Sequence, residues 1–178
     1  MNDFERSDPL FSLCGLNCGL CPMKLGGYCP GCGQGNRPCR IARCGMEHQV
    51  EYCFQCPEYP CPHYDRAGEA DSFITYLHRE QDMRKAQSMG VEAYSAEQAE
   101  KGKLLDALLT HYNSGREKTL FCLAVNLLEV GDIQTVLDEG RRLAPELPVK
   151  EKARYVSSRL REIASERGIV LKLRKKAR

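Results

Sequence analysis

Ten of the eleven cysteines lie within one stretch of 48 residues, and they are the side chains of this sequence best suited to chemistry. They include three pairs separated by only two residues, which are Cys18 with Cys21, Cys29 with Cys32, and Cys53 with Cys56. Such spacing lets the backbone turn so that both sulfur atoms face one ion, and four thiolates satisfy the tetrahedral coordination of zinc. The predicted metal ligands are Cys14, Cys18, Cys21, Cys29, Cys32, Cys39, Cys44, Cys53, Cys56 and Cys61.

The number of ions stays open because ten ligands do not divide by four. Two four-thiolate sites would leave two cysteines spare, or one sulfur could bridge two ions. His48 and His63 raise the number of candidate ligands to twelve, although each is also typical of a solvent-facing loop histidine. We expect two or more zinc ions. Cys122 lies in the most apolar segment, where a free cysteine behaves as a small hydrophobic residue, and we assign it to the core.

An iron–sulfur cluster is the alternative cofactor, because thiolates also bind iron. The spacing of Cys14, Cys18 and Cys21 matches that used by radical enzymes dependent on S-adenosylmethionine. The chain after Cys21 has neither the length nor the alternating strands and helices of the barrel in those enzymes. The ferredoxin run C-x2-C-x2-C-x3-C-P is also absent. The alternative function is therefore electron transfer or redox chemistry.

The location expected from the sequence is the cytoplasm. The first twelve residues carry four charges and no apolar run, so no signal peptide is predicted. No segment approaches the roughly 20 apolar residues that cross a bilayer. In a reducing compartment a dense cysteine pattern binds metal more often than it forms disulfides. A secreted disulfide scaffold is the rival interpretation.

Charge and motifs argue against two function classes. The net charge is −1 over residues 1–68 and +3 over residues 69–178, and eight metal-bound thiolates would make the first part clearly anionic. Nucleic-acid binding requires the opposite charge. We find no nucleophile elbow, phosphate-binding loop or His-Glu-x2-His motif, so we do not expect an enzyme. The expected partner is an unidentified protein or small molecule.

Two regions with different compositions predict the fold. Residues 12–65 are rich in Gly, Pro and Cys and predict tight turns stapled by metal, an irregular zinc-knuckle region. Residues 70–170 carry apolar stripes at helical spacing and predict an all-α domain, followed by a basic tail at 171–178. The stripes predict helices at about 70–89, from Ser95, from Ser114 and from Asp132, and a last helix from Pro148 to near Gly168.

The cysteine segment resembles a known family. Cys14-Gly-Leu-Asn-Cys18-Gly-Leu-Cys21, Cys29-Pro-Gly-Cys32, Cys39-x4-Cys44 and Cys53-Phe-Gln-Cys56-x4-Cys61 are similar to the domain of unknown function 3795 family. The resemblance covers about residues 12–65. It implies a small, cysteine-rich prokaryotic protein presumed to bind zinc, and it implies no reaction.

Overall fold

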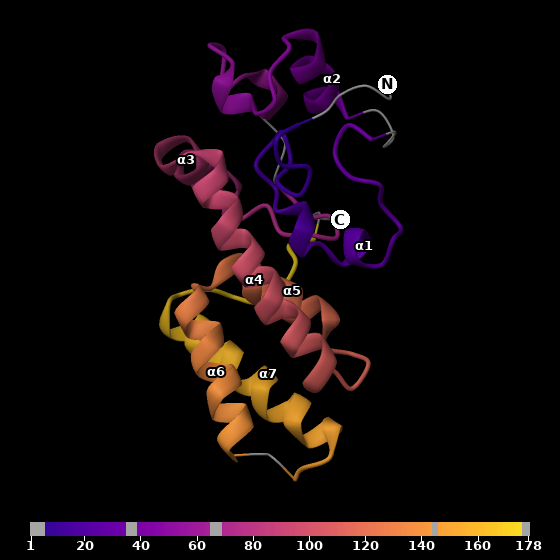
Figure 1. The fold of residues 1–178 in the computed structure, drawn as a ribbon, viewed down its shortest axis with the longest axis vertical. Helices are drawn as coiled ribbons and strands as arrows, with labels where there is room; N and C mark the ends of the chain where they lie inside the picture. The colour runs from indigo at the N-terminus through magenta and orange to yellow at the C-terminus, as the bar shows by residue number, and fades with distance from the viewer. Residues whose placement is uncertain (1–5, 35–38, 65–68, 144–145, 176–178) are drawn as a thin grey trace. The chain divides into compact units, whose positions relative to one another are not determined.

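The computed structural model describes residues 6–34, 39–64, 69–143 and 146–175, and they form two compact units (Figure 1). Unit 1 comprises Met1–Gln98 and Leu173–Arg178, and unit 2 comprises Ala99–Lys172. The predicted bounds 12–65, 70–170 and 171–178 stay a prediction. Within the described residues, no helix combines the length and the apolar character that a membrane span requires.

The cysteine-rich part of unit 1 is built from short helical turns and contains no strand among its described residues. Three are 3-10 turns and two are α-helices, in the order η1 (Cys18–Leu20), α1 (Pro22–Leu25), α2 (Arg40–Glu47), η2 (Cys53–Gln55) and η3 (Pro62–Tyr64). One isolated antiparallel bridge joins Phe11 to Asn17. The helical character and the cysteine-rich N-terminal region are as predicted, whereas the metal staple stays a prediction.

Two longer helices complete unit 1, and both start at positions other than those predicted. Helix α3 runs over Arg79–Met89 rather than from residue 70. Before it, the Asp71 carboxylate accepts the Tyr76 N–H at 2.9 Å and Thr75 Oγ1 accepts the Leu77 N–H at 3.2 Å, so side chains compete there with helical hydrogen bonds. Helix α4 (Val91–His111) starts directly after Gly90, ahead of Ser95.

The core of unit 1 joins the cysteine segment to these helices. Phe11, Leu13 and Tyr52 are at most 1% exposed, and they pack with Met83 of α3 and Tyr94 of α4. The Phe11 ring lies 5.4 Å from the Tyr52 ring and 4.7 Å from the Tyr94 ring, centroid to centroid. Burying each such side chain contributes about 1.5–3 kcal/mol. The cysteine loops therefore pack on an aromatic core that α3 and α4 complete.

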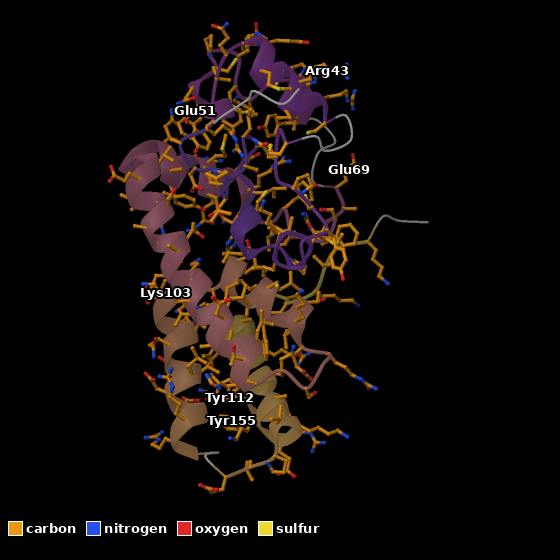
Figure 2. All side chains as sticks on the ribbon, turned by 45° about the vertical axis from the view of Figure 1, so that its right-hand side comes forward. Arg43, Glu51, Glu69, Lys103, Tyr112 and Tyr155 are labelled. Carbon is orange, nitrogen blue, oxygen red and sulfur yellow. The ribbon has the colours of Figure 1, made fainter. Side chains whose placement is uncertain are left out.

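Unit 2 is a helical bundle of the C-terminal part of α4 with α5 (Lys118–Leu127), α6 (Val130–Leu143) and α7 (Val149–Glu166). Every residue of α5 from Leu120 to Leu127 is buried, as its apolar sequence predicts for a central helix. Helices α6 and α7 pack side by side (Figure 1). Tyr155, labelled in Figure 2, and Arg159 both donate to the Glu139 carboxylate, at 3.2 and 2.8 Å.

The C-terminal segment is tied into unit 1 through Asp71. The fully buried carboxylate of Asp71 pairs with Arg174 Nη2 at 2.7 Å, and the Asp71 N–H donates to the Arg174 carbonyl at 2.9 Å. Burial alone would raise the pKa of Asp71, but the hydrogen bonds from Arg174 and Tyr76 outweigh it and lower that pKa. The described part of the predicted basic tail is thus anchored by an ion pair whose carboxylate is buried and whose arginine is partly exposed.

We predict that Gly15→Ala destabilises unit 1 by about 2 kcal/mol or more. Gly15 has φ +91°, and a Cβ there would lie 2.7 Å from the backbone oxygen of Arg79 and 2.4 Å from Met83 Cγ. Gly27→Ala is the matched control, because Gly27 has φ +73° with nothing within 4 Å. It should cost only the backbone strain, about 1 kcal/mol. Denaturant midpoints of the two variants test this, and equal losses would contradict close packing at Gly15.

Candidate metal centre

Two of the three C-x2-C pairs have the same local geometry. Cys18 and Cys53 each begin a 3-10 turn, and Cys21 and Cys56 end those turns in extended conformation, at φ/ψ of −88°/130° and −81°/132°. The N–H of the second cysteine donates to the carbonyl of the first, at 3.1 Å and 3.0 Å. Tight turns at these pairs were predicted from their spacing.

The third pair is shaped by glycine and by two basic side chains. Gly31, between Cys29 and Cys32, has φ +115°, a conformation that favours glycine. Lys24 Nζ donates to the Pro30 carbonyl at 2.6 Å, and Arg6 Nη2 donates to the Cys32 carbonyl at 3.4 Å. These contacts hold the backbone at Pro30 and Cys32 in place.

All eleven cysteines lie within the described residues, and all are free thiols. We sort the ten clustered thiols into two groups according to which thiol charges contribute to the raised pKa values of five of them. The six-thiol group contains Cys14, Cys18 and Cys32, whose pKa values are raised, and Cys21, Cys29 and Cys39, whose charges contribute to those shifts. The four-thiol group contains Cys44 and Cys53, whose pKa values are raised, and Cys56 and Cys61, whose charges contribute to those shifts. Each group draws its members from segments separated in sequence.

Burial is the main cause of the high thiol pKa values in the six-thiol group. It raises the pKa of Cys14 from 9.0 to about 11 and that of Cys18 to about 12, and charge on the Cys32 thiol adds to both shifts. The pKa of Cys32 is raised by burial and by the neighbouring Cys39 and Cys29. At neutral pH these thiols carry protons unless a cation replaces them.

Cys53 connects the two groups. Its pKa is raised to about 12, mainly by burial; charge on Cys14, Cys61 and Cys44 also raises this pKa, and the hydrogen bond from the Tyr64 hydroxyl lowers it. Its N–H donates to the Leu13 carbonyl at 2.9 Å, which joins the two cysteine segments. Cys53 is therefore the thiol whose loss should disturb the largest part of the cluster.

Basic and hydroxyl side chains surround the six-thiol group. Arg79, only 6% exposed, has its guanidinium carbon 4.7 Å from the centroid of the Tyr64 ring, and its charge lowers the pKa of Cys14. The charge of Arg6 lowers the pKa of Cys18 and of Cys32. Ser12 Oγ lies 3.3 Å from Cys14 Sγ and accepts the Leu16 N–H at 2.7 Å, which leaves its own hydrogen for the sulfur. These contacts favour thiolates.

The two candidate histidines differ in their surroundings. His48, the residue after α2, has Nδ1 2.9 Å from the Cys44 carbonyl oxygen and 3.6 Å from Cys44 Sγ. His63 is exposed on η3. Of the two histidines, His48 thus contacts a predicted ligand, whereas His63 faces solvent.

The donor atoms fit zinc in type, because thiolate sulfur and imidazole nitrogen are its usual protein ligands. Among residues 6–34, 39–64, 69–143 and 146–175, however, no three His, Cys, Asp or Glu side chains are grouped so that they could hold a metal ion. Binding would require the thiols of each group to converge further. Cys122, buried at 4% exposure on α5, belongs to unit 2 rather than to the cluster.

Comparison with known proteins gives one match. Residues 24–66 match the model of the family described as "Protein of unknown function (DUF3795)". This confirms the resemblance over the segment that contains Cys29 to Cys61, whereas Cys14, Cys18 and Cys21 precede the DUF3795 match. No curated protein and no solved structure matched the chain.

The sequence reasoning missed Arg79, Arg6, Ser12 and Tyr64. A signal for Arg79 was present, because it lies four residues before Met83 and seven before Ala86 and so shares the buried face of α3. No comparable signal marks Ser12 or Tyr64, whose contacts arise from loop geometry. These side chains surround the thiols without being ligands themselves.

We predict that Cys53→Ser lowers both bound metal and stability, whereas Cys122→Ser lowers stability alone, by about 1–3 kcal/mol. The two thiols are matched in burial, at 9% and 4% exposure, so loss of a buried sulfur is common to both variants. Elemental analysis with denaturant unfolding distinguishes them. Loss of metal from Cys122→Ser would contradict its assignment to the core.

Proposed function

We propose that this is a cytoplasmic metal-binding protein in which the clustered cysteines of unit 1 bind two or more zinc ions. The main support is the clustering of ten cysteines in one stretch of unit 1, where charge on thiols from separate segments helps to raise the pKa values of Cys14, Cys18 and Cys53. A divalent cation replaces the protons of such thiols and removes the repulsion between their charges. The DUF3795 match adds the cysteine pattern and no reaction.

The four-thiol group is the proposed ligand set of one zinc ion. Its four members equal the tetrahedral coordination number of zinc. Charge on Cys61 and Cys56 helps to raise the pKa of Cys44, and charge on Cys61 and Cys44 helps to raise that of Cys53. His48 is the available substitute for one thiolate because of its contact with Cys44. The remaining zinc would take ligands from the six-thiol group, with Arg79 and Arg6 offsetting the excess negative charge.

The metal has a structural role in this proposal. Four thiolates around one zinc leave no open position for water, so hydrolysis at the ion is not expected. The metal would instead fix loops that are poor in apolar residues, while the helical unit 2 binds a protein or small-molecule partner.

An iron–sulfur cluster is the second candidate, and one observation favours it. Charge on Cys14 and Cys21 contributes to the raised pKa of the Cys18 thiol, so the three cysteines with the spacing used by cluster-binding enzymes interact electrostatically. Such a cluster would give the protein an electron-transfer function.

We predict roughly two zinc ions per chain and no visible absorption band in protein purified without oxygen. Zinc has one accessible oxidation state, and its thiolate complexes are colourless. Elemental analysis and a visible spectrum of the same sample test this. About four irons with acid-labile sulfide and a brown colour that bleaches on reduction would replace the zinc proposal with electron transfer.

We predict that zinc affinity rises steeply between pH 6 and pH 8. Because the thiols are protonated without metal, each bound thiolate releases one proton, and a four-thiolate site releases about four. Competition with a chelator of known affinity at several pH values measures the slope. Cys122→Ser should leave the slope unchanged, whereas a pH-independent affinity would argue against thiolate ligands.

A further inference from the structure

Unit 2 contains a pocket of about 1010 Å³ that none of the cysteine chemistry uses. It lies where α7 faces the first turn of α5 and the loop before that helix. Leu120 and Val149 supply apolar lining, and most other lining side chains are basic or hydroxylic.

Four cations line the pocket, namely Arg116, Lys150, Arg154 and Arg161. In the described parts of the chain, none of the four forms an ion pair with a carboxylate. Lys150, Arg154 and Arg161 are spaced by four and seven residues, so they share one face of α7. Like charges at such spacing repel one another, and an anion bound against this face would relieve that repulsion.

The pocket has one acidic lining residue, Glu117, and its carboxylate is already engaged by the loop. It accepts the Ser114 N–H at 2.7 Å, the Ser114 hydroxyl at 3.0 Å and the Arg116 N–H at 3.3 Å. Burial would raise the pKa of Glu117, but these hydrogen bonds lower it overall. Glu117 therefore orders the loop and leaves the pocket with a net positive charge.

A buried hydroxyl gives an independent indication of a ligand. Ser157 lines the pocket on the same face of α7 and is only 6% exposed. Its Oγ has no hydrogen-bond partner among the described residues. Buried side-chain oxygens are rarely left in that state in folded proteins, and an oxygen of a bound molecule would supply the missing partner.

We propose that this pocket binds a small organic molecule carrying two or more phosphate groups. Arginine forks match phosphate oxygens, four cations suit a multiply charged group, and the apolar wall accepts the organic part. The inference rests on the proposed ligand-binding role of unit 2 and does not involve the metal.

Titration calorimetry of the full, metal-loaded chain with tripolyphosphate at physiological salt tests the inference. Arg154→Gln should weaken binding by about tenfold or more, as expected for loss of a charge-assisted hydrogen bond. Ser157→Ala should weaken it less. Arg142→Gln is the matched control, because Arg142 is an exposed arginine of α6 outside the pocket lining, and it should leave the affinity unchanged.

Equal weakening by Arg142→Gln and Arg154→Gln would overturn the proposal, since it would indicate nonspecific attraction to positive charge. Tighter binding of a single-stranded oligonucleotide that depends on Arg154 would also overturn it in favour of nucleic acid. Far-UV circular dichroism checks that each variant is folded, and Arg154→Gln changes only an exposed side chain. Metal content measured on the same samples separates failure at this pocket from failure of the zinc proposal.

Discussion

The packing of Phe11 between Tyr52 and Tyr94 is the interaction on which unit 1 depends. Those rings come from the N-terminal segment, the start of η2 and helix α4, and each is almost fully buried. Asn17 reinforces the junction, because its side chain accepts a hydrogen bond from the Tyr94 hydroxyl and donates one to Asp82. The loops around Cys14–Cys21 and Cys53–Cys61 are thereby held beside each other, which brings distant thiols within electrostatic range.

The second constraint on unit 1 is the cost of burying the negative charge of thiolates. Basic side chains offset part of that cost without a metal. A four-thiolate zinc site carries a net charge of about −2, which is costly to bury. Arg79 is buried in an aromatic setting beside the thiols, and Arg6 reaches the same group from the N-terminal segment. The attraction between a permanently charged guanidinium and nearby thiolates offsets the free-energy cost of burying both groups. The arginine and the proposed metal therefore support each other's burial.

The sequence predicted helices and turns better than it predicted which side chains contact one another. The apolar run of α5 identified a buried helix and the apolar stripe of α7 identified a helix with one buried face, because the 3.6-residue period reports which face avoids water. The C-x2-C spacing identified tight turns, since so short a link allows few backbone paths. The start of α3 was missed because Asp71 and Thr75 bind nearby N–H groups, a competition that periodicity does not encode. The roles of Arg79 and Ser157 depend on neighbours far away in sequence. They could therefore be recognised only in the three-dimensional structure.

The ion pair of Arg174 with Asp71 gives the chain an unusual connectivity, because unit 2 is an insertion within the sequence of unit 1. A segment held at both ends has fewer conformations when unfolded than one with a free end, so its unfolding gains less entropy. Anything that loosens unit 1 would release both ends of the insertion together. The folding equilibria of the two units are thus linked through chain connectivity.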